Sequence, residues 1–377
     1  MRRRTVHAPG TPRAAGRKEL TMQNLERIQS AIAAADMQAL LLIDPKNRYY
    51  ATGFPSSDGV VLVTAEKAYL IIDGRYIEAC RAAIGDSAEV LLCDQEHPAR
   101  KLLKEIIDAN GITALGAEDG CLTYQQYTMY EKLLGLELKP AQGLLNRLRS
   151  QKQPHELVYM QQAQDITDAA FTEVLKHIRP GVTEREIAAE ITYQMLLRGA
   201  EGNSFDPIVV AGARGSMPHG VPSDAKIKEG DFVTMDFGCL KGGYCSDMTR
   251  TVAVGHVTDE MKKVYDTVLR AQLAGIEIAK AGVTGAAIDG AARDVITEAG
   301  YGEYFTHSFG HSLGLDIHEA PNCTPTNQFP MPEHTVCSAE PGIYIPGHFG
   351  VRIEDVMHLT KDGSEVLTHS PKELIIV

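Results

Sequence analysis

Two acidic residues, Asp236 and Asp247, lie on either side of a glycine turn within residues 231–254. Runs rich in β-branched and aromatic residues flank Lys241-Gly242-Gly243, which predicts a hairpin of two antiparallel strands. A turn centred between Lys241 and Gly242 would place the two carboxylates opposite each other on one face. Like charges at that spacing destabilise a sheet, so a shared proton or a divalent cation must offset their repulsion. The hairpin alone leaves open a different register, or an Asp that is a solvated edge residue.

A second pair of acids, Glu340 and Glu354, repeats this arrangement later in the chain. The turn Pro346-Gly-His-Phe-Gly350 lies between them and is centred near Gly347. Symmetric pairing about that turn places both glutamates on the same face of a hairpin. The sequence therefore predicts four carboxylates that converge on one site.

Three histidines, His307, His311 and His318, lie between the two hairpins and are separated by Gly310 and Gly314. A single histidine is more often a core or surface residue, but three beside paired acids favour a metal site. Four carboxylates and an imidazole exceed what one tetrahedral zinc ion requires, and they match two divalent ions that share bridging carboxylates. Two such ions can activate a water molecule and polarise a neighbouring carbonyl group, which predicts hydrolysis.

The elements that must position these residues fall into two predicted domains, because 377 residues exceed the range of about 250–300 in which one core grows. Residues 22–150 alternate short strands and helices, which predicts a small α/β domain. The expected strands are 39–43, 59–63, 68–72, 90–92 and 112–115, and the expected helices are 24–35, 75–84, 98–109 and 123–134. Residues 147–155 are polar and predict a linker to a second domain, 151–377.

The second domain contains a weak internal repeat. Arg179-Pro-Gly-Val-Thr183 and Lys280-Ala-Gly-Val-Thr284 each begin a predicted helix, and the element order that follows is the same in both halves. Gly-Val-Thr is a common helix entry, so chance is the alternative. The repeat predicts a duplicated, pseudo-two-fold architecture with the two hairpins side by side in one sheet.

Composition excludes several classes of partner. A formal net charge of −12 argues against nucleic acid and against an anionic membrane surface. No apolar run approaches the roughly 18 residues of a membrane span. The cysteine count of 7 is odd and includes no Cys-x-x-Cys, which favours reduced thiols in a cytoplasmic protein. Residues 1–21 are rich in arginine and are expected to be a disordered extension, with Met22 as a possible start and organelle targeting as the alternative.

The chain from about residue 22 onward carries an ordered series of motifs. They are Asn47-Arg-Tyr-Tyr-Ala-Thr-Gly-Phe54, Asp73-Gly-Arg-Tyr76, Phe205-Asp-Pro-Ile-Val-Val-Ala-Gly212, Pro218-His219, Met235-Asp-Phe-Gly238, Ser246-Asp-Met-Thr-Arg-Thr251, Gly310-His311, His318-Glu319, Glu340-Pro-Gly342 and Arg352-Ile-Glu354. Each motif is weak alone, but the set resembles the pita-bread-fold metallopeptidases of the Xaa-Pro aminopeptidase and prolidase branch. The resemblance implies an α+β fold, with a pita-bread catalytic domain preceded by a smaller α/β, ribonuclease H-like domain.

The resemblance also implies five metal ligands. Asp247 and Glu354 would bridge two divalent ions, Asp236 would complete one site, and His311 with Glu340 would complete the other. A hydroxide held between the ions would attack the scissile carbonyl. Oxygen-rich ligation favours Mn²⁺, with Co²⁺, Fe²⁺ and Zn²⁺ as alternatives.

Further catalytic roles follow from the same resemblance. Glu340 is the expected general base, because a carboxylate beside the attacking water can take its proton. The family's outer histidines, which orient substrate and move protons, correspond to His219, His307 and His318. Arg352 shares a strand face with Glu354 and is expected to brace a carboxylate such as Asp247.

Three neighbouring residues are interpreted from position alone. Thr249 shares the parity of Asp247, so it is a candidate hydrogen-bond donor behind the ligands. Tyr244 is expected to pack at the turn, and Asp355 is expected to be a solvated strand end.

The implied substrate is a peptide with proline at its second position, cleaved after the first residue. Family prolidases often carry an arginine after the His-Glu pair to hold a dipeptide's carboxylate, whereas Ala320-Pro-Asn322 follows His318-Glu319 here. The sequence therefore favours an Xaa-Pro aminopeptidase over an Xaa-Pro dipeptidase. Two competing hypotheses are an inactive pita-bread binding module and a metal-independent amidinohydrolase like creatinase. A homodimer is expected from the family.

Overall fold

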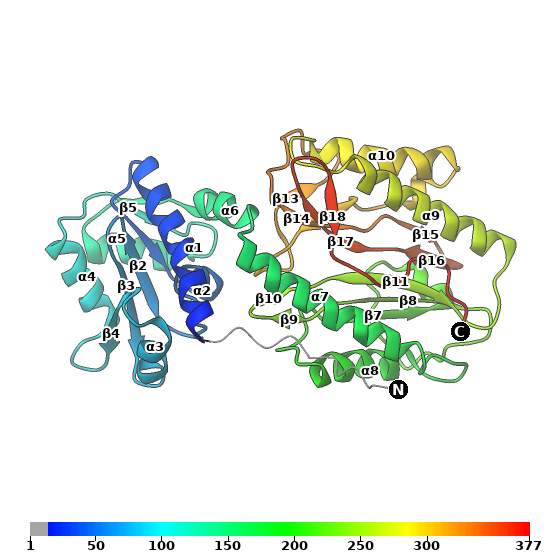
Figure 1. Ribbon diagram of the computed structural model, residues 1–377, viewed down its shortest axis with the longest axis horizontal. Helices are drawn as coiled ribbons and strands as arrows, with labels where there is room; N and C mark the ends of the chain where they lie inside the picture. Colours follow the sequence, from blue (N-terminus) through cyan, green and yellow to red (C-terminus); the bar gives the residue numbers. More distant parts are fainter. Residues whose placement is uncertain (1–13) are drawn as a thin grey trace, which may run out of the picture. The chain divides into compact units, whose positions relative to one another are not determined.

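The computed structural model describes residues 14–377, and side chains from residue 23 onward. The predicted extension comprises residues 1–21. Residues 1–13 lie outside the described part of the chain, and residues 14–21 belong to helix α1 (Ala14–Ala34). The chain divides into two compact units, the first ending at Leu148 and the second being Arg149–Val377 (Figure 1). Helix α6 (Gln142–Ser150) runs across this division.

The first unit is built on one mixed sheet with the strand order β4-β3-β2-β1-β5-β6. Its strands are β1 (Ala39–Leu42), β2 (Val60–Thr64), β3 (Ala68–Asp73), β4 (Glu89–Cys93), β5 (Leu115–Ala117) and β6 (Leu138–Pro140). Its further helices are α2 (Pro45–Thr52), α3 (Ile77–Ile84), α4 (Ala99–Ala109) and α5 (Tyr124–Leu134). The predicted strands 59–63 and 68–72 correspond to β2 and β3, which pair antiparallel as a hairpin. Helix α2 was not predicted, although Asp44 caps it by accepting hydrogen bonds from the backbone of Lys46 and Asn47.

The second unit begins each of its halves with a pair of packed helices. The first pair is α7 (Pro154–Val174) and α8 (Glu184–Leu197), and the second pair is α9 (Asp259–Ile278) and α10 (Gly285–Glu298). The side chain of Thr183 caps α8 and that of Thr284 caps α10, as the sequence repeat predicts. The duplication is thus present in element order and in capping.

The strands of the second unit form two principal sheets, β11-β8-β7 and β13-β12-β14-β17-β18, with the small ladders β10-β9 and β15-β16. They are β7 (Ile208–Ala211), β8 (Phe232–Phe237), β9 (Leu240–Lys241), β10 (Tyr244–Cys245), β11 (Met248–Ala253), β12 (Gly310–Ser312), β13 (Glu319–Cys323), β14 (Val336–Ala339), β15 (Gly342–Ile345), β16 (Phe349–Arg352), β17 (Asp355–Leu359) and β18 (Ser364–Val366). The prediction that the two hairpins lie side by side in one sheet is wrong. The two hairpins belong to separate ladders and meet through single contacts, such as Glu354 N donating to Thr249 O at 3.1 Å.

The register of the first hairpin differs from the prediction by two residues. Lys241 pairs with Tyr244, and Asp236 pairs with Thr249 rather than with Asp247. Gly242 and Gly243 form the two-residue turn with φ of 58° and 76°, the left-handed values that such a turn requires. Because side chains alternate with a period of two, the shift leaves Asp236 and Asp247 on one face, one step apart along it.

The register of the second hairpin matches the prediction. Gly342 pairs with Arg352 in the β15–β16 ladder, and Ala339 pairs with Asp355 in the β14–β17 ladder. Glu340 and Glu354 lie at the junction between these two ladders, in the same register. Symmetric pairing about Gly347 therefore places the second acidic pair correctly.

The polar stretch interpreted as a linker contains two buried cations. Arg149 is 6% exposed and Lys152 is 1% exposed. Both pair with Glu319, whose carboxylate lies 2.9 Å from Lys152 Nζ, and Arg149 also reaches Asp316 at 2.6 Å. These cations hold Asp316 and the start of β13 at Glu319.

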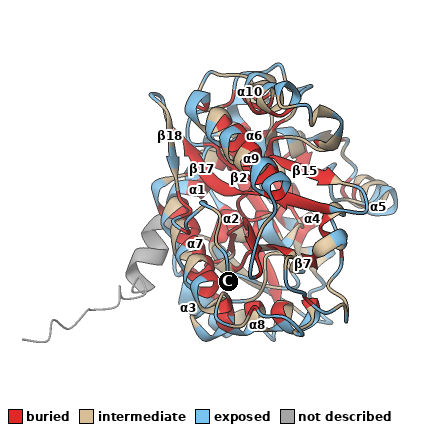
Figure 2. Cartoon of the chain, turned by 90° about the vertical axis from the view of Figure 1, so that its right-hand side faces the viewer, coloured by how far each residue is buried: buried red, intermediate tan, exposed pale blue. Residues whose placement is uncertain are grey.

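Each unit has its own apolar core. In the second unit, one cluster lies under α7 and α8 and another under α9 and α10. Strands β15 and β17 are buried, while the helices turn an exposed face outward (Figure 2). Among residues 14–377, no helix is both long and apolar enough to cross a bilayer.

Candidate metal centre

The five predicted ligands come from five separate places in the second unit. Asp236 is in β8, Asp247 immediately precedes β11, and His311 is in β12. Glu340 directly follows β14, and Glu354 lies between β16 and β17. Gly310 allows the close packing beside His311, because a Cβ on it would lie 2.1 Å from the carbonyl oxygen of Ser338. The two hairpins and β12 thus bring all five side chains together.

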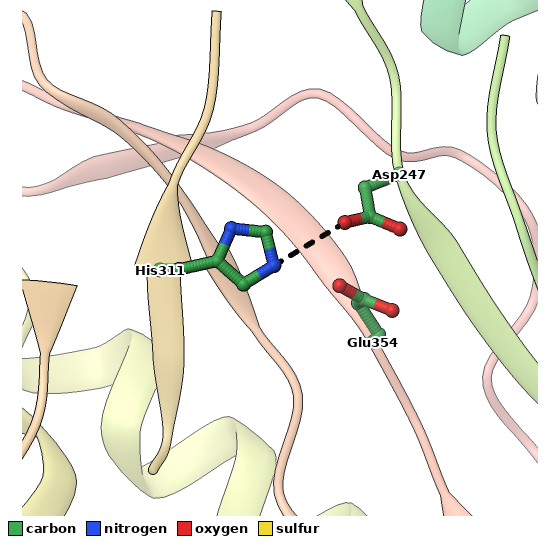
Figure 3. A group of neighbouring side chains, drawn as sticks. All are labelled: Asp247, His311 and Glu354. Carbon is green, nitrogen blue, oxygen red and sulfur yellow. Dashed lines mark ion pairs between the residues drawn. The ribbon is translucent and has the colours of Figure 1, made fainter. Parts of the chain in front are cut away.

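The ligand atoms of Asp247, His311 and Glu354 all lie within 4.8 Å of one another (Figure 3). His311 Nε2 is 3.5 Å from Asp247 Oδ2 and 3.4 Å from Glu340 Oε1. His311 Nδ1 lies 3.2 Å from the carbonyl oxygen of Ser312, which can only accept, so Nδ1 carries the proton. Because burial lowers the pKa of His311, its Nε2 presents a bare lone pair to two carboxylates.

The electrostatics of the site favour a bound cation. Burial, followed by the charges of the neighbouring acids, raises the pKa of Asp247 and of Glu354 well above ordinary values. Burial likewise raises the pKa of Glu340. Asp236 Oδ1 and Asp247 Oδ1 are buried and have no hydrogen-bond partner among the described residues. The unprotonated nitrogen of His311 therefore faces carboxylate oxygens, some of which have no hydrogen-bond partner. Divalent metal ions bind such a set of nitrogen and oxygen donors.

Arg352 braces a different carboxylate from the one expected. Its Nη2 lies 2.7 Å from Asp236 Oδ2, and its Nε donates to Thr249 Oγ1 at 2.9 Å. The expectation that Arg352 braces a carboxylate is confirmed, but the partner is Asp236 rather than Asp247, because β16 packs against β8. Thr249 behaves as predicted and donates to Glu354 Oε2 at 2.7 Å.

Two residues that hydrogen-bond to side chains of the site were not predicted from the sequence. Ser338 Oγ donates to Glu340 Oε1 at 2.9 Å. Tyr344 is within 2.9 Å of Arg352 Nη1 and 2.7 Å of His307 Nε2, and burial raises its pKa to about 12. The hairpin register could have identified Tyr344, because it lies one step along the same face from the Gly342–Arg352 pair.

The interpretations of Tyr244 and Asp355 have different outcomes. Tyr244 is buried, stacks on Tyr159 and hydrogen-bonds Glu156, so its packing role agrees with the structure. Asp355 is 0% exposed and lies 2.7 Å from Arg250, so the idea of a solvated strand end is wrong. Its partner is more than one hundred residues earlier, which no local pattern indicates.

His307 has a defined protonation state. Its Nδ1 lies 2.8 Å from the carbonyl of Ser308 and therefore donates, so Nε2 accepts the Tyr344 hydroxyl proton. Burial lowers the pKa of His307, in agreement with a neutral ring. Arg293 holds the backbone of this loop by donating to the carbonyl of His307 at 2.8 Å.

His219 and His318 are the exposed histidines of the site. The ring of His318 packs edge-on against His311, with 4.4 Å between centroids. Burial lowers the pKa of His318. Both rings are therefore available to a ligand that enters from outside.

A cavity of about 480 Å³ joins these groups. All nine predicted site residues line it: Asp236, Asp247, His311, Glu340, Glu354, His219, His307, His318 and Arg352. Its apolar wall includes Phe205, Ile208 and Val221. Among the described residues that line it, Arg352 is the one lysine or arginine. The cavity combines acids for cations, histidines for proton transfer and an apolar surface for a substrate.

Comparisons with known proteins cover both units. Residues 24–151 match the family described as Creatinase/Prolidase N-terminal domain, and residues 158–361 match Metallopeptidase family M24. The predicted fold, a pita-bread catalytic domain preceded by a smaller α/β domain, is confirmed by these matches and by solved structures.

Individual relatives align over nearly the whole chain. An Xaa-Pro dipeptidase of Pyrococcus horikoshii is 37% identical, with 93% of this chain and 99% of that protein covered. The structure of an Xaa-Pro dipeptidase from Bacillus anthracis gives a TM-score of 0.90 at 42% identity, covering 95% of this chain and 100% of that one. An X-Pro aminopeptidase from Thermotoga maritima gives 0.88 at 35%, covering 92% and 100%.

Proposed function

Because the chain belongs to metallopeptidase family M24, we propose that it is a metal-dependent exopeptidase that cleaves peptides between their first residue and a proline at the second position. The observation that carries the proposal is the convergence of five metal-binding side chains and three further histidines on one cavity. An inactive binding module would have no need for buried carboxylates of raised pKa. A metal-independent amidinohydrolase would not need this acidic set either.

The metal would be held by Asp236, Asp247, His311, Glu340 and Glu354, and we propose two ions, with Mn²⁺ favoured by oxygen-rich ligation. When bound, the ions supply an acidified water molecule and polarise the scissile carbonyl group. Glu340, which Ser338 orients, is placed to accept a proton from a water molecule in the cavity.

The histidines act on the substrate side of the reaction. His219 and His318 lie exposed in the cavity wall, where they can orient the peptide and protonate the departing proline nitrogen. An X-Pro bond has no N–H to be recognised, so shape and this proton transfer must provide the selectivity. His307 receives its hydrogen bond from Tyr344 and supports Arg352 through that hydroxyl.

We propose an aminopeptidase that prefers peptides longer than two residues. A dipeptide presents a carboxylate beside its proline, and a cation is the usual partner for one. Arg352 is already engaged by Asp236, Thr249 and Tyr344, and Ala320-Pro321-Asn322 supplies no arginine. The second candidate is an Xaa-Pro dipeptidase, which the names of the relatives from Pyrococcus horikoshii and Bacillus anthracis favour.

We further propose a homodimer in a reducing compartment such as the cytoplasm. All seven cysteines lie within the described residues and are free, including the buried Cys323 and Cys337, whose sulfur atoms are 4.0 Å apart. Symmetric dimers are the commonest oligomers.

The test is hydrolysis of Ala-Pro-Ala and Ala-Pro by protein stripped with a chelator and reloaded with Mn²⁺. We expect metal-dependent release of alanine, with a higher kcat/KM for the tripeptide. A higher value for the dipeptide would select the dipeptidase, and no turnover of either peptide would refute the proposed activity. Ala-Ala-Ala serves as the control for the proline requirement.

A further inference from the structure

Arg250 is a fully buried arginine directly behind the candidate metal centre. It is 1% exposed, and each of its five N–H donors has an acceptor. A buried guanidinium must satisfy all of these donors, so its surroundings specify its position tightly. None of the proposed catalytic steps uses this residue.

Two of the donors contact the metal side of the molecule. Arg250 Nη1 donates to the carbonyl of Thr249 at 3.0 Å and also to the carbonyl of Glu354. Glu354 in turn donates its backbone N–H to Thr249 and accepts the Thr249 hydroxyl on its carboxylate. Arg250 therefore closes a set of contacts that fixes both the backbone and the side chain of one proposed ligand.

Of the other three donors, two reach residues 368–377, which we call the strap, and the third reaches Asp355 in β17. Arg250 Nε donates to Pro371 O at 2.9 Å, and Nη2 donates to Ser370 O and to the Asp355 carboxylate, each at 2.7 Å. Lys372 of the strap pairs with the second Asp355 oxygen, which also accepts from Gln272 at 2.9 Å.

The strap is itself held at both ends. Asp168 accepts the backbone N–H groups of His369 and Ser370 at 2.8 and 2.9 Å. At its far end, Ala253 and Gly255 donate to the carbonyls of Ile375 and Val377. Arg250 thus lies between an anchored strap and the ligand Glu354.

We infer that Arg250 is a positioning residue for the metal ligand Glu354, and that the strap, through Lys372 and Asp355, fixes Arg250 in that position. The inference rests on the proposed metal centre but not on its substrate. Groups that orient metal ligands typically alter metal affinity by about 10–100-fold when they are replaced.

The experiment measures Mn²⁺ binding by calorimetry on full-length, chelator-stripped protein. We expect Arg250→Lys to raise the Kd by about 10–100-fold and Lys372→Met to raise it by about 10-fold. Lys372→Arg, which keeps the cation, should restore binding to near the wild-type value. The absorption spectrum of the Co²⁺-loaded protein should change in Arg250→Lys, because it reports ligand geometry and not only occupancy.

The matched control is Lys262→Met, which removes an exposed ion pair between Lys262 and Asp266 on α9. It should leave both the Kd and the Co²⁺ spectrum unchanged. If Arg250→Lys does not fold, the Lys372→Met and Lys372→Arg pair decides. Folded variants with a wild-type Kd and spectrum would overturn the role of Arg250, whereas a wild-type protein that binds no Mn²⁺ would overturn the metal centre as well.

Discussion

The carboxylate of Asp247 occupies a position that a folded protein tolerates poorly without a cation. It is buried, one of its oxygens has no partner among the described residues, and three further acids raise its pKa. Without a bound cation, burial and the repulsion from these acids outweigh the attraction of Arg352. The negative charge of Asp247 is therefore unfavourable for folding and favourable for binding a metal ion.

The variant Asp247→Asn separates these two effects. We expect activity to fall below about one-thousandth of the wild-type value, because a metal ion lowers the activation barrier by several kcal/mol. We also expect the metal-free variant to be more stable than the metal-free wild type, by on the order of 1 kcal/mol at neutral pH, because a raised pKa marks a destabilising charge. Peptide hydrolysis measures the activity, and urea unfolding in the presence of a chelator measures the stability. Full activity in Asp247→Asn would refute its role as a ligand.

Individual site residues could be predicted from the sequence, while some of their partners could not. Parity along a strand places Arg352 on the face of Glu354, but it does not say whether Asp236 or Asp247 lies across from the guanidinium. That choice depends on how β16 packs against β8, in another ladder. The burial of Asp355 could not be predicted for the same reason, since Arg250 comes from a distant strand.

At the scale of elements, turn geometry decides how well a hairpin can be predicted. The turn around Gly347 is symmetric, and the register inferred from it is correct through two successive ladders. In the first hairpin, Gly242 and Gly243 both take positive φ, so the turn centre lies one residue later than expected. Because the resulting shift is even, the predicted face of each acid is still correct.

Glu319, the first residue of β13, provides a prediction about the stability of the fold. Burial alone would raise the pKa of Glu319, but Lys152 and Arg149 outweigh it and lower that pKa to about 2 from an ordinary 4.5. Replacing Glu319 by Gln leaves two buried cations without their main partner. We expect a loss of about 3 kcal/mol in the free energy of unfolding at pH 6, measured by urea denaturation.

The pH dependence of that loss has a defined sign. A depressed carboxyl pKa contributes stability that is fully present above about pH 4.5 and is lost as the pH falls toward 2. The difference between wild type and Glu319→Gln should therefore shrink between about pH 6 and pH 3.5. Lys104, in an exposed pair with Asp108, provides the comparison: Asp108→Asn should change stability by less than about 1 kcal/mol. An equal loss at both pH values would contradict the role given to the Glu319 ion pairs.

At the scale of the whole molecule, metal binding and folding should be linked. A metal at 100 times its Kd stabilises the folded state by about 2.7 kcal/mol. For a chain of 377 residues, stripping the protein with a chelator should lower the Tm by about 3–4 °C, measured by calorimetry. Because Asp247, Glu340 and Glu354 have raised pKa values, the stripped protein should also lose stability as the pH rises above the ordinary carboxyl pKa of about 4. A Tm that does not respond to the chelator would contradict this linkage.

The turn between Glu340 and Glu354 has a consequence for changes in chain length. Gly347 lies at its tip, and a Cβ there would meet nothing within 4 Å, so extra residues at the tip can loop outward. One residue added or deleted within β16 would instead rotate Glu354 to the opposite side of the ribbon. In a library of single-codon insertions, variants with an insertion at the tip of this hairpin should therefore retain Mn²⁺ binding, whereas variants with an insertion in its strands should lose it.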